Sequence, residues 1–253
     1  MAMDFNHGSA WVYGQETTVA DKINARIDEA MVARNKKQKP RAYLGGSRVG
    51  EPCARRLVYE FLHTHPDEGK DFDGRILRVF DAGHKFEDLS VAWLRLAGFD
   101  LRTNKKDGSQ FGFSAANGKL AGHIDGVIVA GPDVGIIWPA LWEHKALNTK
   151  SWNDLVKHGL QVSKPVYFGQ VQLYMAYMEL AVTLFTALNK DTEELYHEVV
   201  PFDPAEAQRL SDRAVDVLRA AECGEVLPRI AAASDFYLCR MCPYAERCWK
   251  EAA

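Results

Sequence analysis

The chain lacks any apolar run long enough to cross a membrane. A transmembrane helix needs about 18 or more consecutive apolar residues, and no such stretch occurs in the 253 residues. The first residues, MAMDFNHGSAWVYGQETT, have neither the basic segment nor the apolar segment of a secretory signal. We therefore expect no membrane partner and a cytoplasmic location.

The chain also lacks an excess of charge of one sign. It has 31 Lys and Arg against 34 Asp and Glu, a net charge of −3, so it has no overall basic character of the kind that announces a nucleic-acid binder. Basic residues are nevertheless grouped in two places. The first group is Lys36, Lys37, Lys39 and Arg41, and the second, looser group is Arg55, Arg56, Arg75, Arg78 and Lys85. Taken alone, each group is best explained as solvated surface.

Cysteine is scarce, with five residues, but four of them form a pattern. Cys239, Cys242 and Cys248 give C-x2-C-x5-C, and Cys53 lies far upstream of them. Without an export signal, we expect reduced thiols that serve a metal rather than disulfides. Four thiolates suit either tetrahedral zinc or an iron–sulfur cluster, and the spacing alone leaves both open.

Hydrophobic periodicity predicts helices at both ends of the chain and a small sheet between them. The predicted helices are 17–36, 47–61, 74–97, 167–180 and a last helix with Asp203 as its N-cap, ending near Gly224. The predicted strands are 120–129, 136–147, 181–189 and 195–202. This order indicates an α/β or α+β fold with a single small mixed sheet flanked by helices.

Two carboxylates and a lysine fall on neighbouring predicted strands. Asp125 lies in a strand rich in Ile and Val, where an unpaired buried charge would be very costly. Glu143 and Lys145 share one face of the next strand, while His144 points to the other face. If the strands pair as a hairpin, Asp125 and Glu143 face one cavity, and this set suits a hard divalent cation. By itself the pattern is weak, because a surface salt bridge gives the same sequence.

Two helical elements accompany these strands. His84 lies on the helix that precedes them. Gln170 and Tyr174 lie on the helix that follows, four residues apart, and so share one helix face. An amide and a phenol on one face can bind a phosphate or a base edge, although either element alone is more often a satisfied polar group in a core.

In this order, the elements resemble the PD-(D/E)xK nuclease superfamily. The matching motifs are Ser47-x5-Cys53, Gly83-His84, His123-Ile124-Asp125-Gly126, Glu143-His144-Lys145, Gln170-x3-Tyr174 and Cys239-x2-Cys242-x5-Cys248. Within the superfamily, the chain is most similar to RecB-like exonucleases with an iron–sulfur cluster. These include the CRISPR-associated exonuclease of the adaptation module, its phage-borne relatives and the AddB nuclease domain. The resemblance runs from about Ser47 to Cys248, with Ile124 where the superfamily name has Pro.

The resemblance implies a restriction-endonuclease-like nuclease domain over residues 47–253, preceded by an N-terminal helical extension over residues 1–46. It implies Mg2+ or Mn2+ held by His84, Asp125, Glu143 and the His144 carbonyl. Asp125, Glu143 and Lys145 would be the catalytic residues. Gln170 and Tyr174 would contact DNA, with Arg55 and Arg75 guiding its backbone. Cys53, Cys239, Cys242 and Cys248 would hold a structural 4Fe-4S cluster, while Cys223 matches no family position.

The activity implied is that of a metal-dependent DNA exonuclease. It would prefer single-stranded ends, in the 5′-to-3′ sense common in the family, during DNA recombination, repair or replication. One alternative is an end-processing subunit of a larger complex, such as CRISPR adaptation. Another is a DNA-binding module with little activity, which the presence of Asp125, Glu143 and Lys145 disfavours. A homo-oligomer and recombination or adaptation partners stay open, and the location is the host cytoplasm if a phage encodes the chain.

Overall fold

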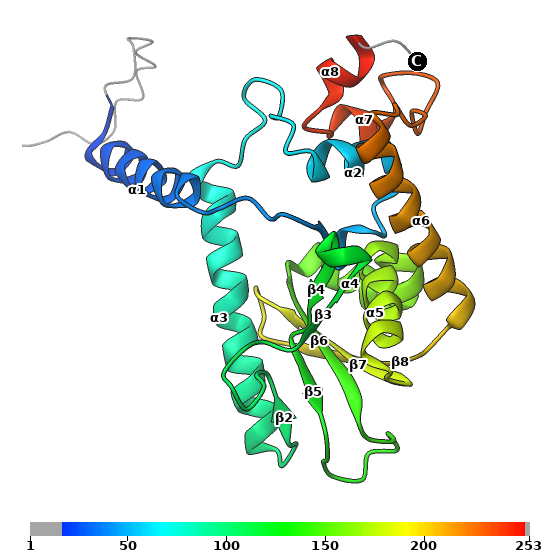
Figure 1. Cartoon of the computed structure of the whole chain (residues 1–253). Helices are drawn as coiled ribbons and strands as arrows, with labels where there is room; N and C mark the ends of the chain where they lie inside the picture. Colours follow the sequence, from blue (N-terminus) through cyan, green and yellow to red (C-terminus); the bar gives the residue numbers. More distant parts are fainter. Residues whose placement is uncertain (1–16, 251–253) are drawn as a thin grey trace, which may run out of the picture. The chain divides into compact units, whose positions relative to one another are not determined.

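A computed structural model of the chain describes residues 17–250 (Figure 1). Its contacts divide the chain into two compact units. Among the described residues, the first contains 17–38 together with Phe72–Arg78, and the second contains Lys39–Asp71 together with 79–250. The predicted domain boundary after residue 46 stays a prediction.

The first unit is built on helix α1 (Val19–Lys36), which confirms the first predicted helix. Thr18 caps it: the Asp21 N–H donates to the Thr18 hydroxyl, and the Thr18 N–H donates to the Asp21 carboxylate at 2.9 Å. An ion pair between Arg78 and Asp28 joins α1 to the beginning of α3 (Gly74–Leu96). None of the residues of α1 is buried, so its apolar positions Val19 and Ile23 face solvent.

The second unit contains two small sheets rather than the single sheet that was expected. The first has the order β1-β4-β3 and is formed by β1 (Leu44–Gly45), β4 (Leu120–His123) and β3 (Gly112–Ala115). The second has the order β2-β5-β6-β7-β8. Its strands are β2 (Leu101–Arg102), β5 (Gly126–Ile128), β6 (Ala140–Leu147), β7 (Val182–Asn189) and β8 (Leu195–Pro201). Both sheets are mixed, because β1–β4 and β6–β7 are parallel and the other pairs are antiparallel.

The predicted strand 120–129 is divided because its backbone changes partners at Ile124 and Asp125. Before this point β4 pairs with β3, and after it β5 pairs with β6. Side chains satisfy the backbone at the break: Gln110 Nε2 donates to the Ile124 carbonyl at 3.0 Å, and the Asp125 carboxylate accepts from the His144 N–H. Asp125 therefore lies at the junction between the two sheets.

Helices α4 (Thr149–Ser163) and α5 (Pro165–Met178) pack against strands of the second unit. The other helices of this unit are α2 (Ala54–Phe61), the part of α3 from Val79, α6 (Pro204–Cys223), α7 (Tyr237–Arg240) and α8 (Ala245–Lys250), with short 3-10 turns at Gly46–Arg48 and Ala116–Gly118. Figure 1 shows α5 beside α6, which in turn contacts α2. As predicted, Asp203 caps α6, which ends at Gly224 with a φ of 66°. Within residues 17–250, none of the helices combines the length and apolar composition needed to cross a bilayer.

Helix α3 buries a different face from the one that its apolar residues suggest. Leu89, Trp93 and Leu96 are exposed, Leu96 to 89%. In the part of α3 from Val79, the buried positions are Ser90 and Val91, and Ser90 lies 3.0 Å from the His144 ring in β6. A polar contact with the sheet therefore sets the orientation of this helix, together with Val91 in the core beside Trp142.

Candidate active site

Asp125 and Glu143 come together where β5 meets β6. These strands are antiparallel with Gly126 opposite Trp142, so the next pair along the ladder is Asp125 and Glu143. The Asp125 carboxylate accepts a hydrogen bond of 2.8 Å from the His144 N–H, between Glu143 and Lys145 on β6. The hairpin that the sequence predicts is therefore present, and it places the two carboxylates side by side.

The Glu143 carboxylate is completely buried, with 0% of its surface exposed. Its Oε1 accepts hydrogen bonds from Lys145 Nζ and from Gln170 Nε2, while its Oε2 is buried without a hydrogen-bond partner. Burial raises the pKa of Glu143, and the nearby Asp125 charge raises it further. A buried acceptor without a donor is unfavourable, and a divalent cation ligated by oxygen would satisfy it. The donor set therefore fits a metal of the Mg2+ or Mn2+ class.

Lys145 shares the Glu143 face of β6, as the alternation along a strand requires. Its ammonium bonds to Glu143 and lies 5.1 Å from the centre of the Tyr167 ring. Burial opposes the charged form, but Glu143 and then Asp125 outweigh this effect and raise the pKa of Lys145. This environment favours the ammonium form, which suits stabilisation of negative charge more than removal of a proton from water.

His144 points to the opposite face of β6, as predicted. Its ring is buried and lies 3.0 Å from the Ser90 hydroxyl on α3. Burial, followed by the charge of Lys145, lowers the pKa of His144 to about 4. The neutral ring therefore ties α3 to β6, while the role of the His144 carbonyl as a metal ligand stays a prediction.

Helix α3 contributes Glu87, which the sequence reasoning missed. Burial, followed by the charge of Asp125, raises the pKa of Glu87 to about 7. The charge of Glu87 also raises the pKa of Glu143. Glu87, Asp125, Glu143 and Lys145 thus form one electrostatic group, which we call the carboxylate site. The signal for Glu87 was present in Gly83-His84-Lys85-Phe86-Glu87, because residues three apart share a helix face.

The structure does not bring His84 into the carboxylate site through any contact. His84 is exposed, and it makes no hydrogen bond or ion pair within residues 17–250. It lies one helical turn before Glu87 on α3. Its role as a metal ligand therefore stays a prediction, and Glu87 is the α3 side chain that interacts with the two strand carboxylates.

Gln170 and Tyr174 lie beneath the carboxylates rather than at the surface. Both are buried, Tyr174 to 2% exposure. Gln170 Nε2 donates to Glu143 Oε1 at 2.5 Å. The Tyr174 ring packs edge-on against Phe113, with 5.7 Å between the ring centres, and the Ser47 side chain hydrogen-bonds its hydroxyl. This burial argues against direct contact with DNA and favours a role in positioning Glu143.

The two arginines predicted to guide DNA have different surroundings. Arg75 is exposed near the start of α3, in the first unit, and its role stays a prediction. Arg55 is buried, with 2% of its surface exposed. Its guanidinium donates to the Leu227 carbonyl and contacts the carbonyl and Sγ of Cys248. Burial of Arg55 therefore argues against a DNA contact and places it beside the cysteines.

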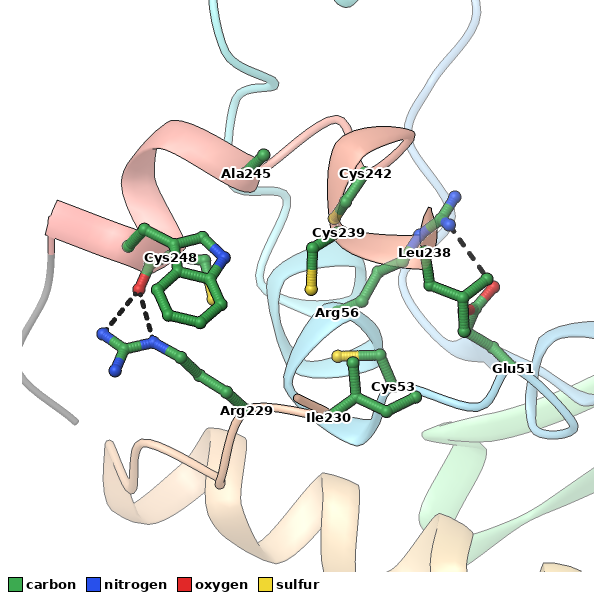
Figure 2. Close-up of a pocket in the computed structure, with 11 residues that line it drawn as sticks. Glu51, Cys53, Arg56, Arg229, Ile230, Leu238, Cys239, Cys242, Ala245 and Cys248 are labelled. Carbon is green, nitrogen blue, oxygen red and sulfur yellow. Dashed lines mark hydrogen bonds and ion pairs between the residues drawn. The ribbon is translucent and has the colours of Figure 1, made fainter. Parts of the chain in front are cut away.

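The four predicted cluster cysteines line one pocket, which we call the cysteine pocket (Figure 2). Cys53 precedes α2, Cys239 lies in α7, Cys242 follows α7 and Cys248 lies in α8. Figure 2 shows them around one space between α2 and the C-terminal helices. The other lining residues are mainly apolar or basic: Glu51, Arg56, Arg229, Ile230, Leu238, Ala245 and Trp249. Cys223 is exposed at the end of α6 and does not line this pocket.

Neither site has the geometry of a closed single-ion site. In the part of the chain that the structure describes, no three His, Cys, Asp or Glu side chains are arranged to hold one metal ion. A tetrahedral zinc site needs its four sulfurs about 2.3 Å from one ion. An iron–sulfur cluster binds its four thiolates through separate irons, so the sulfurs need not approach one point. Burial raises the pKa of Cys239 and of Cys242. The donor set, four thiols among basic and apolar residues, fits a soft metal centre.

No family model and no curated protein matches the chain by sequence. Among solved structures, the chain is similar to an alkaline exonuclease, LHK-Exo, from Laribacter hongkongensis, with a TM-score of 0.52 and 16% identity over 78% of this chain and 94% of that chain. It is also similar to LHK-Exo in complex with dAMP, with a TM-score of 0.53 and 16% identity over 74% of this chain and 91% of that chain. A further structure, SSO0001, has a TM-score of 0.47 and 13% identity over 91% of this chain and 98% of that chain, a likeness that carries no argument. At this level of identity the likeness to LHK-Exo shows a shared fold, and the two small mixed sheets flanked by helices are consistent with the predicted PD-(D/E)xK-like core.

Proposed function

We propose that the protein is a metal-dependent DNA exonuclease. The observation that carries the proposal is the buried, unpaired Glu143 Oε2 beside Asp125 and Lys145, in a chain with the fold of an alkaline exonuclease. One of the similar LHK-Exo structures is a complex with dAMP. A deoxynucleoside monophosphate is what an exonuclease releases from the end of DNA, so this neighbour supports DNA as the substrate.

The reaction is in-line attack of water on a phosphodiester. Asp125 and Glu143 are the side chains that would hold Mg2+ or Mn2+, and Glu87 adds negative charge nearby. When bound, the metal supplies Lewis-acid stabilisation of the charge developing on the phosphate. Lys145, held by Glu143, stabilises the same charge and orients the attacking water. Gln170 fixes the Glu143 carboxylate through Oε1, which leaves Oε2 for the cation.

The finer features of the activity rest on the family resemblance. They are a preference for single-stranded ends, a 5′-to-3′ sense, and a place in DNA recombination, repair or replication. DNA held by basic side chains, among them the exposed Arg75, is released as salt rises, because dissociation returns counterions to the phosphates. The proposed protein partners are a second copy of the chain or the proteins of an adaptation or recombination complex.

We also propose that the cysteine pocket holds a 4Fe-4S cluster on Cys53, Cys239, Cys242 and Cys248. The convergence of four thiols from distant parts of the chain supports this cofactor. Its role is structural, because it links the start of α2 to α7 and α8 within the second unit. Metal binding by ligands that are distant in the chain contributes directly to folding free energy.

The test of the nuclease is cleavage of end-labelled DNA by the purified full chain with Mn2+ or Mg2+. Single-stranded and double-stranded substrates labelled at either end are compared, so that strand preference and sense are read from the products. Asp125→Ala is expected to abolish cleavage. Glu222→Gln, which changes an exposed carboxylate on α6, is the matched control and retains it. Equal cleavage by Asp125→Ala and the parent chain would refute the proposal, and DNA binding without cleavage would favour the binding-module alternative.

A further inference from the structure

The cysteine pocket is bordered by a buried arginine that has no carboxylate partner among the described residues. Arg55 is 2% exposed. Its guanidinium contacts two carbonyls, of Leu227 and Cys248, and the Cys248 sulfur at 3.7 Å from Nη1. Within residues 17–250, no Asp or Glu forms an ion pair with Arg55. Backbone carbonyls satisfy its donors but carry no net charge, so its positive charge is left unbalanced.

The neighbouring arginines differ in this respect. Arg48 bonds to Glu51 at 3.0 Å and to Glu60 at 2.9 Å. Arg56, which lines the cysteine pocket, pairs with the same two carboxylates at 3.4 and 2.9 Å. Two arginines and two glutamates thus form a balanced group beside the pocket. Arg55 lies one residue from Arg56 but points to the other side, toward Cys248.

A buried charge is strongly unfavourable unless an opposite charge lies near it. Glu225 lines a pocket together with Arg55, but its carboxylate pairs with Arg219 at 3.8 Å. The sulfur that Arg55 contacts belongs to Cys248, and its thiolate form could supply the negative charge. A cluster held by four thiolates carries net negative charge and would balance Arg55. We propose that Arg55 is the counter-charge and sulfur hydrogen-bond donor of the iron–sulfur centre in the cysteine pocket, an inference that rests on the proposed cofactor.

This role has a consequence for redox chemistry. Hydrogen bonds to the sulfurs and the local net charge set the reduction potential of an iron–sulfur centre. Reduction adds one electron, and thus one negative charge, to the cluster. A buried guanidinium beside Cys248 stabilises the added charge, so it raises the potential. Arg55 is therefore a positioning and tuning residue for the cofactor and does not contact the substrate.

The experiment is a redox titration of the full chain, purified without oxygen and reconstituted with iron and sulfide. Dithionite donates the electrons, and absorbance with electron paramagnetic resonance reports the reduced cluster. For Arg55→Met we expect the equilibrium constant for one-electron reduction to fall about tenfold or more, which is about 59 mV. Arg209→Met is the matched control, because Arg209 is exposed, pairs with Glu206 on α6 and does not line the cysteine pocket, and we expect a much smaller change.

An Arg55→Met protein with the iron content and potential of the parent chain would overturn the inference. If Arg55→Met does not fold, Arg55→Gln decides the question. Glutamine keeps an amide donor for the neighbouring carbonyls but removes the charge, so a fall of about tenfold or more supports the proposal and an unchanged potential overturns it. Zinc in place of iron in the parent chain would overturn this inference and the cofactor together. The DNA cleavage assay on the same samples tests the nuclease separately.

Discussion

The carboxylate site and the cysteine pocket carry unbalanced buried charge of opposite sign. In the first, three carboxylates surround one ammonium, and Glu143 Oε2 is buried without a donor. In the second, the Arg55 guanidinium is buried without a carboxylate partner among the described residues, and it contacts Cys248, one of the four cysteines of the pocket. Because buried charge is costly in either sign, each site indicates the charge of its partner: a cation for the first and an anionic thiolate cluster for the second.

The two sites also differ in how the chain builds them. The carboxylate site is built from neighbouring elements: Asp125 and Glu143 lie on one hairpin, and Gln170, which bonds to Glu143, lies on the helix that packs against it. The cysteine pocket joins Cys53 to residues almost two hundred positions away. Closing such a long segment is entropically unfavourable, so we expect the pocket to depend on its metal and the hairpin to form without one.

The strongest test of the carboxylate site is Glu143→Gln. Glutamine keeps the shape but removes the charge that a cation needs, so kcat should fall about 10³-fold or more, equivalent to roughly 4 kcal/mol. Thermal stability without metal should not fall, because the change removes a buried charge whose pKa is raised by burial and by Asp125. Mn2+ should raise the melting temperature of the parent chain but not that of the variant.

Glu222→Gln is the control for this measurement and should resemble the parent chain in cleavage and in its response to Mn2+. A Glu143→Gln protein with more than about a tenth of the parent kcat would contradict the role of Glu143 as a ligand.

The cysteine pocket is tested by Cys53→Ala against Cys223→Ala. Removing Cys53 takes away the ligand that connects α2 to the C-terminal helices, so we expect loss of the cluster colour and a markedly lower yield of folded protein. Cys223 is exposed and outside the pocket, and its replacement should change neither. The measurements are iron content per chain and soluble yield. A colourless, well-folded Cys53→Ala protein with full metal content would contradict the assignment.

The contribution of α3 to the carboxylate site is tested by Glu87→Gln and His84→Ala. Glu87 interacts with Asp125 and Glu143, so its replacement should lower kcat by roughly 10- to 100-fold and raise the Mn2+ concentration for half-maximal activity. Asp88→Asn is the control, since Asp88 pairs with Lys85 at the surface. A larger loss for His84→Ala than for Glu87→Gln would support the predicted role of His84 as a metal ligand and contradict that of Glu87.

The sequence predicts helix ends and side-chain directions correctly where these depend on neighbouring residues. The cap at Asp203 and the glycine end at Gly224 define α6 correctly, and strand alternation places Glu143 and Lys145 on one face with His144 on the other. These features depend on residues within a few positions of each other. The meeting of Asp125 with Glu143 also follows, because two consecutive strands pair most simply as a hairpin.

The sequence does not predict features that depend on contacts between distant parts of the chain. The strand 120–129 divides because its two halves have different partners, which no local pattern records. Helix α4 was missed, and Gly159, with a φ of 74°, interrupts its helical geometry near the C-terminal end. Arg55 looks like surface charge in the sequence, yet Leu227 and Cys248, far along the chain, bury it. The choice between His84 and Glu87 likewise depends on how α3 is rotated against β6, which the Ser90–His144 contact sets.

The smallest expected change in kcat comes from replacing Gln170, one of two buried glutamines on α5. Gln170 bonds to the Glu143 carboxylate, whereas Gln172 bonds to the Pro201 carbonyl and the Asp203 N–H, away from the carboxylates. We expect Gln170→Ala to lower kcat about tenfold, because Glu143 is less firmly positioned, with little change in KM. Gln172→Ala should instead lower the free energy of unfolding by about 1–3 kcal/mol, since it leaves buried backbone groups unsatisfied, and leave kcat per folded molecule unchanged. Steady-state kinetics and urea unfolding of both variants separate these effects, and equal kcat values for the two variants would place Gln170 among the residues that only stabilise the fold.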